Sequence, residues 1–195
     1  FSVNNKDVYV SFESSSLGDS VSWMGQIINF KKKTGCKKVY VKTFRNELFD
    51  IERYKEDDIH IIDSHNNSDI HIYLGVFMDK ENVWKIDRHI RDWRKVPIGK
   101  IAADILGIEY IETRPYMNFT SKIEGSDKKS IVIGPESTAQ LKHWNREGAW
   151  QDVIDWHTKN GYTVYYAGKQ KDHNYNNVIT LESDLSIISN TMLKS

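Results

Sequence analysis

The chain alternates apolar and polar positions over several short stretches, and this alternation is typical of β-strands. Residues 8–12 and the run KKVYVKTF, residues 37–44, are the first two such stretches. Between them apolar side chains recur at helical spacing, and Gly35 can adopt the left-handed conformation that ends a helix. The order strand, helix, strand predicts a parallel βαβ unit. The runs DIHIID, residues 58–63, and DIHIYLG, residues 69–75, predict two further strands.

The pattern of apolar and polar residues changes several times between residues 77 and 129. Residues 77–97 are charged and aromatic, which indicates a long loop with a short helix. In residues 98–106 the helical spacing of apolar side chains returns, and Gly107 ends this predicted helix. Residues 113–129 are polar and have no clear period, so we expect them to form a linker between two domains.

After this linker the opening pattern repeats. Residues 129–134 predict a strand, residues 149–160 a helix ended by Gly161, and residues 162–168 and 176–181 two more strands. A last helix is expected to begin at Ser183 or Asp184. The predicted class is therefore α/β with two Rossmann-like units, the second incomplete. We expect an N-terminal domain over 1–112, a linker over 113–129 and a partial C-terminal domain over 130–195.

Composition excludes several classes of function. The net charge is zero and the pI is about 7.2, so there is no general positive field to hold nucleic acid or an anionic membrane. No run of about 18 apolar residues predicts a membrane span. The single cysteine, Cys36, excludes an internal disulfide and a cysteine-rich metal site. These features favour a protein of the reducing cytoplasm. The scattered histidines, among them His60, His65 and His71, are interpreted as ordinary side chains and not as metal ligands.

Two loops lie where parallel α/β sheets bind ligands, between the carboxyl end of a strand and the next helix. The first is ESSSLGDS, residues 13–20, which is neither a dinucleotide fingerprint nor a P-loop. Gly18 permits a tight backbone and the close approach of a ligand. Asp19 has two interpretations. It can cap the helix that follows, or its carboxylate can act as a general base on a bound hydroxyl.

The second loop is GPESTAQLKHWNREGAW, residues 134–150. Ser137, Thr138 and nearby backbone amides can hydrogen-bond a phosphate, and Lys142 offers a positive charge to a diphosphate. The alternative is a solvated loop with Trp144 folded onto the core. The order of the two loops favours a two-domain glycosyltransferase, in which one half holds an acceptor and a base and the other holds a nucleotide sugar.

The quoted runs resemble a known family. SLGDSVSWM is similar to the loop that opens the lipopolysaccharide heptosyltransferases. The longer run ESSSLGDSVSWMGQIINFKKKTGCKKVYVKTFRNELF resembles the bacterial autotransporter heptosyltransferases, and so do RDWRKVPIGKIAADILGIEYIETRP and ESTAQLKHWNREGAWQDVIDWHTKNGYTV, in the same order. The resemblance implies a GT-B fold, an ADP-heptose donor and a protein or glycan hydroxyl as acceptor. It also implies inversion at the anomeric carbon without a metal in the chemistry, and no cofactor besides the donor.

Carried over position by position, the resemblance assigns roles to individual residues. Asp19 matches the general base. Thr138 and Lys142 match residues that bind the diphosphate of the donor, and Ser137 and Gln140 neighbour the same phosphates. The expected sugar or acceptor pocket comprises Ser16, Gly18, Ser20, Trp23 and Trp144. For the two tryptophans, packing of a helix onto its sheet is an equal alternative.

The run RDWR has its own alternatives. Its charged residues Arg91, Asp92 and Arg94 either form a surface ion-pair cluster or bind the acceptor, and the ion-pair cluster is the favoured interpretation.

The sequence also departs from the family's pattern. It has no Gly/Ser-rich loop of the kind that contacts nucleotide and sugar in the C-terminal half. Cys36 alone cannot build the cysteine-based iron site of the autotransporter enzymes, so neither that metal nor their large oligomer is predicted. We expect the remainder of the donor half to be missing from the chain, to be supplied by a partner chain, or to have been lost together with catalysis. A non-catalytic module that binds a nucleotide or a partner is therefore the alternative function.

Overall fold

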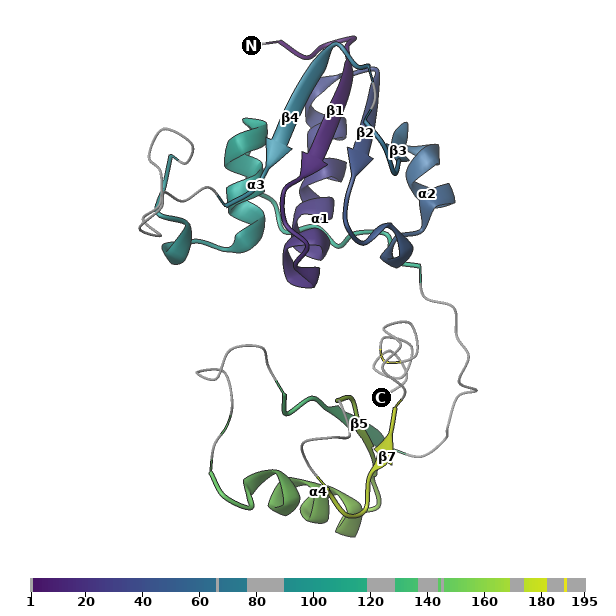
Figure 1. The fold of residues 1–195 in the computed structure, drawn as a ribbon, viewed down its shortest axis with the longest axis vertical. Coiled ribbons are helices and arrows are strands. Elements are labelled where there is room, and N and C mark those ends of the chain that lie inside the picture. The colour runs from purple at the N-terminus through teal and green to yellow at the C-terminus, as the bar shows by residue number, and fades with distance from the viewer. Residues whose placement is uncertain are drawn as a thin grey trace. The chain divides into compact units, whose positions relative to one another are not determined.

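The computed structural model describes residues 2–65, 67–76, 90–118, 129–136, 144, 146–168, 174–181 and 188 (Figure 1). The chain divides into two compact units, Phe1–Asn118 and Phe119–Ser195, and each has a parallel sheet of its own. None of the helices within the described residues is long and apolar enough to cross a membrane.

The sheet of the first unit contains four strands. They are β1 (Asp7–Phe12), β2 (Lys38–Lys42), β3 (Ile59–Ile61) and β4 (Ile70–Leu74), in the spatial order β3-β2-β1-β4. Every neighbouring pair is parallel. All four strands lie where the alternation of apolar and polar residues predicts them, and β1 and β2 enclose a helix as expected of a βαβ unit.

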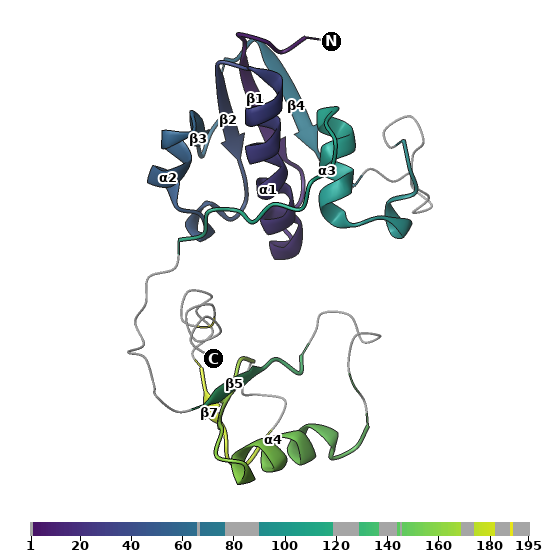
Figure 2. The same cartoon turned by 180° about the vertical axis from the view of Figure 1, so that it is seen from behind.

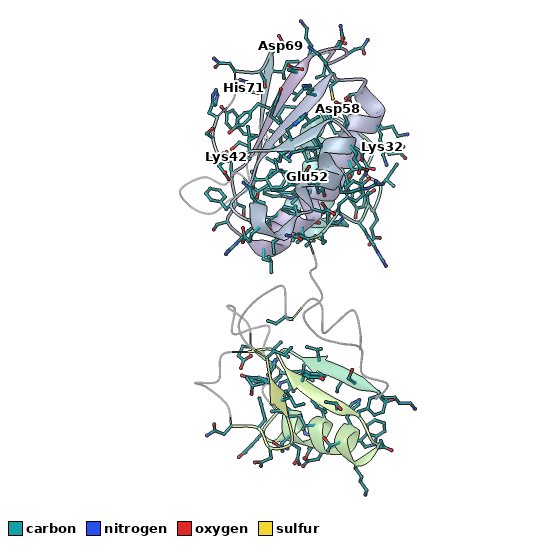
Figure 3. The ribbon with its side chains drawn as sticks, turned by 90° about the vertical axis from the view of Figure 1, so that its right-hand side faces the viewer. Lys32, Lys42, Glu52, Asp58, Asp69 and His71 are labelled. Carbon is teal, nitrogen blue, oxygen red and sulfur yellow. The ribbon has the colours of Figure 1, made fainter. Side chains whose placement is uncertain are left out.

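The two faces of this sheet differ. Figures 1 and 2 show α1 (Leu17–Thr34) across one face of the sheet. Because side chains of a strand alternate between the two faces, Val8, Val10 and Phe12 of β1 share one face, and all three are buried. On the other face four rings stand in register across the strands, His60, Tyr40, Tyr9 and His71 in that order. In Figure 3, His71 and Lys42 lie on one side of this unit, and Lys32 of α1 lies on the opposite side.

Helix α1 begins earlier than its apolar stripe suggests. Its N-cap is Ser16, two residues before the Gly-Asp pair, and its last turn carries Lys31, Lys32 and Lys33. Gly35 ends it with φ of 64°, in the left-handed region that the sequence predicts for this glycine. Helix α3 (Ile98–Leu106) packs beside α1 and ends at Gly107, whose φ is 69°.

Short elements complete the first unit, and the sequence pattern does not predict all of them. A 3-10 turn, η1 (Asn46–Leu48), leads into α2 (Ile51–Glu56), whose N-cap Asp50 accepts a hydrogen bond from the amide of Arg53 at 3.1 Å. A second 3-10 turn, η2 (Trp93–Lys95), lies in the segment where a short helix is expected. The remainder of that expected loop, residues 77–89, is outside the described residues.

The end of the first unit differs from the linker that its composition predicts. Residues 113–118 are bonded to the first unit: the amide of Asn118 donates to the carbonyl of Leu48 at 2.8 Å, and the amide of Asp50 donates to the carbonyl of Tyr116 at 3.1 Å. Composition does not reveal this because the partners are distant in sequence. Residues 119–128, the rest of the expected linker, are not described.

The second unit has three parallel strands in the order β5-β6-β7. These are β5 (Ser130–Ile133), β6 (Thr163–Tyr166) and β7 (Ile179–Thr180), with α4 (Ala149–Lys159) between the first two. Its core is formed by Ile133, Ile154, Val164 and Tyr166. The helix expected from Ser183 or Asp184 falls almost wholly outside the described residues.

Candidate functional site

The candidate site of the first unit begins where β1 ends. The amide of Glu13 donates to the carbonyl of Leu74 at the end of β4, at 2.7 Å, and so fixes the start of the loop to the sheet. Ser16 then adopts an extended backbone with φ of −66° and ψ of 132°, and α1 starts at Leu17. The loop is thus held between a central strand and the first turn of an 18-residue helix.

Asp19 is the third residue of α1 and is half-buried. Its Oδ2 atom accepts a hydrogen bond from the hydroxyl of Ser14 at 2.6 Å. The hypothesis that Asp19 caps the helix is wrong, because Ser16 occupies the N-cap position and makes no side-chain capping bond. A carboxylate in the first turn is still favoured by the positive end of the helix dipole. Asp19 is therefore a half-buried carboxylate in the first turn of α1, held by a hydrogen bond from Ser14.

The other pocket residues of this loop lie in different surroundings. Ser16 and Gly18 are exposed, and a methyl group added at Gly18 would meet nothing within 4 Å. Ser20 is fully buried, and its hydroxyl donates to the carbonyl of Ser16 at 3.1 Å. Among these three, Ser16 and Gly18 border the open side of the loop, and Ser20 braces the first turn of the helix.

The two tryptophans also separate. Trp23 is completely buried, lies edge-on to Phe12 at a centroid distance of 5.5 Å, and donates its indole N–H to the carbonyl of Ile98 at 3.2 Å. These contacts support the interpretation that Trp23 packs its helix onto the sheet. Trp144, in the second unit, is 48% exposed and lies edge-on to Trp150 at 5.4 Å. Of the two, only Trp144 presents a ring to solvent.

The predicted donor-binding residues Ser137, Thr138, Gln140 and Lys142 lie outside the described residues. What is described is the stem that carries their loop, residues 134–136, directly after β5. There the hydroxyl of Tyr166, at the end of β6, donates to the carboxylate of Glu136. The other oxygen of Glu136, Oε2, is buried and has no hydrogen-bond partner among the described residues. A half-buried carboxylate with one buried oxygen thus lies directly before residues 137–142, where donor binding is predicted.

Glu136 has an electrostatic effect on its surroundings. The pKa of Tyr175 is raised, mainly by burial of its phenol and further by the negative charge of Glu136. Sequence reasoning did not single out Glu136, although its place immediately before Ser137 at the carboxyl end of a strand is a usable signal. It also did not single out Ser14, the first of three consecutive serines before the Leu-Gly-Asp run.

The charged residues of the RDWR run form ion pairs within the first unit. Arg91 contacts Asp104 of α3 at 2.8 Å, and Arg94 contacts Asp92 at 2.8 Å. Hydrogen bonds from Arg94 lower the pKa of Asp92 to about 2, although this carboxylate is at the surface. These contacts match the ion-pair interpretation. The pair of Arg91 with Asp104 joins the segment before α3 to α3 itself.

Three of the seven histidines, His60, His65 and His71, lie on the face of the first sheet opposite α1. His65 and His71 are neighbours, with 3.3 Å between Nε2 of His65 and Nδ1 of His71, and both rings pack against Tyr9. The pKa of His60 is lowered by burial and then by the nearby charge of Lys38. Within the described parts of the chain, no group of three or more histidine, cysteine, aspartate or glutamate side chains converges to hold a metal ion.

Two units of this kind, each with a parallel sheet, form a fold of the GT-B type. Solved structures of the heptosyltransferase TibC share it. TibC bound to ADP-D-beta-D-heptose aligns with all of this chain and 53% of its own at a TM-score of 0.82 and 19% identity. TibC of enterotoxigenic Escherichia coli aligns with 92% of this chain and 48% of its own at a TM-score of 0.75. At this identity the likeness establishes the fold alone.

The sequence relatives are autotransporter heptosyltransferases, the family that the loop sequences resemble. Aah of Escherichia coli is 26% identical over 83% of this chain. The enzyme BAHTCr of Citrobacter rodentium is 22% identical over 83%, and BimC of Burkholderia thailandensis, named an inactive autotransporter heptosyltransferase, is 22% identical over 84%. No protein-family model matches the chain. The chain spans about two fifths of the length of these relatives, namely 41% of Aah, 39% of BAHTCr and 38% of BimC.

Proposed function

We propose that this chain carries the acceptor half and part of the donor half of an inverting, metal-independent heptosyltransferase. The enzyme would move heptose from ADP-heptose to a hydroxyl of a protein or a glycan. The observation that carries the proposal is Asp19, a half-buried carboxylate held by Ser14 at the carboxyl end of a parallel strand. The likeness of the whole chain to half of an enzyme that was solved with ADP-heptose supports the identity of the donor.

The proposed reaction divides the work between two loops. Asp19 takes the proton from the acceptor hydroxyl as that oxygen attacks the anomeric carbon of heptose. The bond from this carbon to the diphosphate breaks on the opposite face, so the configuration inverts and ADP leaves with the electron pair. Lys142 offsets the charge that develops on ADP, and Thr138, with Ser137 and Gln140 beside it, hydrogen-bonds the phosphates. Ser16 and Gly18 would border the incoming acceptor, with Trp144 as the exposed ring on the donor side.

The proposed reaction needs no metal ion, and the partner that it needs is the remaining donor half. The structural relative TibC is named as an iron-containing dodecamer. The described residues of this chain provide no group of ligands that fits such an ion, and no step of the proposed reaction is assigned to one. We propose that the chain acts in the cytoplasm. There it would work together with the remaining donor half, within the same polypeptide or on a partner chain, and without a nucleic-acid partner.

The central experiment replaces Asp19 in the full-length protein. Asp19→Asn keeps the shape of the side chain but removes the base, so transfer of heptose should fall by about 10²- to 10⁴-fold. Binding of ADP-heptose, measured by calorimetry, should remain. Glu13→Gln removes an exposed carboxylate six residues earlier and serves as the control, with transfer within about threefold of the parent protein. An Asp19→Asn protein as active as the control would refute the assignment of the base.

The donor side is tested by Lys142→Ala. Loss of its charge should weaken ADP and ADP-heptose alike in calorimetry, because the lysine is assigned to the diphosphate and not to the sugar. A change in affinity for the sugar nucleotide without a change for ADP would contradict this assignment.

A non-catalytic module is the second candidate function, and the inactive relative BimC favours it. Such a protein would bind a nucleotide or a partner without transfer. The two functions separate in one assay of the full-length protein, in which thermal shift with ADP-heptose reports binding and mass spectrometry of the acceptor reports transfer. Binding without transfer supports the module, and transfer that depends on Asp19 excludes it.

A further inference from the structure

We propose that Ser14 is the positioning residue for Asp19: its hydroxyl orients the carboxylate so that the other carboxylate oxygen faces the acceptor. This inference rests on the proposed function, because it assigns Ser14 a part in the work of the proposed base. It adds a residue that the sequence analysis did not single out.

The hydrogen bonds of Ser14 determine where its proton points. The amide of Ser16 donates to Oγ of Ser14 at 3.2 Å. With this amide on one side of the oxygen, the hydroxyl proton is directed to Oδ2 of Asp19, 2.6 Å away. This O–O distance lies in the range of about 2.5–2.7 Å that is typical of a hydroxyl bonded to an ionised carboxylate. Ser14 therefore acts as a donor to Asp19 and not as an acceptor from it.

The loop that presents Ser14 is anchored at both ends. Glu13 is bonded to the last residue of β4, and the amide of Ser20 donates to the carbonyl of Ser16 at 3.1 Å in the first turn of α1. The sheet and the helix thereby hold Ser14 in place, and Ser14 in turn holds Oδ2 of Asp19. A functional group held by such a supported neighbour keeps its geometry when substrate binds.

Only one oxygen of the carboxylate is used in this contact. No described residue makes a hydrogen bond to Oδ1 of Asp19 or an ion pair with either oxygen. Ser14 thus fixes the rotation of the carboxylate about its bond to Cβ and leaves Oδ1 for the proton of the acceptor. Without Ser14 the carboxylate would rotate among several orientations, and only a fraction of them would suit proton transfer.

None of the ion pairs among the described residues includes Asp19. Glu13 is the first residue after β1 and is exposed. On β2, Lys42 stands in register with Ser11 on the opposite face of the sheet from α1. On α3, Asp104 is engaged by Lys100 at 2.5 Å and by Arg91 at 2.8 Å. None of these groups pairs with Asp19.

The functional test uses the full-length protein and three variants. Ser14→Ala should lower kcat about ten- to hundredfold, as expected for loss of a hydrogen bond to a charged group, while KM for ADP-heptose changes by less than about twofold. Ser14→Thr restores the hydroxyl and should recover most of kcat. Ser15→Ala removes an exposed neighbouring hydroxyl and should match the parent protein.

A second measurement reads the contact without catalysis. In the 195-residue chain, Asp19→Asn should shift the NMR signal of the Ser16 amide, because Ser14 links the two groups. Asp19→Asn should cause the same shift in a Ser15→Ala background and none in a Ser14→Ala background. A shift that survives in the Ser14→Ala background would overturn the proposed link.

The two measurements separate the failure of this inference from the failure of the proposed function. If Asp19→Asn retains transfer, the base assignment falls, and the inference that Ser14 positions that base falls with it. If Asp19→Asn abolishes transfer but Ser14→Ala behaves as Ser15→Ala in kcat, the function stands and the positioning role of Ser14 is refuted.

Discussion

Gly25 lies in the middle of α1 at a point of very close contact. A methyl group added to it would overlap the carbonyl oxygen of Thr113 and lie 3.1 Å from the carbonyl carbon. Because the obstacle is backbone and not a flexible side chain, Gly25→Ala should destabilise the first unit by about 1–3 kcal/mol, despite the better helix propensity of alanine. Urea unfolding followed by circular dichroism measures this loss.

The control for this prediction is another glycine of the same helix. A methyl group at Gly18 meets nothing within 4 Å, so Gly18→Ala should leave stability unchanged or raise it by up to about 1 kcal/mol. Equal effects of the two substitutions would show that helix propensity, and not the contact with Thr113, sets the outcome.

For the described residues of the candidate site, the sequence does not predict which side chains contact one another. The run from Ser14 to Ser20 holds several side chains that can cap a helix, and sequence alone does not select among them. The helix begins at Leu17, so Asp19 falls inside the first turn and its carboxylate turns to Ser14. The apolar spacing likewise placed Trp23 on α1, and its bond to the carbonyl of Ile98, 75 residues away, fixed it in the core.

At the scale of elements, strands and long helices follow from periodicity, whereas short or irregular elements do not. β1 and α1 are long enough to show a period of two or 3.6 residues. Helix α2 has six residues, fewer than two turns, and therefore no readable stripe. Residues 108–118 show no regular spacing of apolar side chains, and distant residues hold them in place. The side-chain amides of Gln26 and Asn29, for example, both donate to the carbonyl of Ile111.

Tyr54 of α2 provides a test of how this irregular segment is attached. Its side chain is fully buried, and its hydroxyl oxygen accepts the amide of Tyr116 at 3.0 Å. Tyr54→Phe removes the acceptor and leaves this amide unpaired, so the free energy of unfolding should fall by about 1–3 kcal/mol. Hydrogen exchange should at the same time become faster at the amide of Tyr116.

Tyr40→Phe is the matched control, because the hydroxyl of Tyr40 makes no hydrogen bond with the described residues. Its stability should stay within about 0.5 kcal/mol of the parent protein. If Tyr54→Phe changed stability as little as Tyr40→Phe, the segment would not depend on this hydrogen bond.

At the scale of the whole molecule, the sequence indicates the duplicated plan because strand and helix patterns repeat. The parallel pairing of both sheets follows from strands separated by helices. The loop sequences further indicate the resemblance to heptosyltransferases that the relatives confirm. Composition does not show that Tyr116 and Asn118, inside the predicted linker, are bonded through their backbones to the first unit.

Two separate sheets and two separate groups of buried side chains predict that the units unfold independently. Ile27 in the first unit and Ile154 in the second are both completely buried. Replacing either by alanine should cost about 2–5 kcal/mol in its own unit and leave the other unit unchanged. Hydrogen exchange in denaturant, read by mass spectrometry of peptides from each unit, distinguishes the two. Ile27→Ala should speed exchange only in peptides of residues 2–118, and Ile154→Ala only in those of residues 129–181. If either substitution accelerates exchange in both sets equally, the two units form one cooperative body, and a substitution on the donor side would then also disturb the geometry around Asp19.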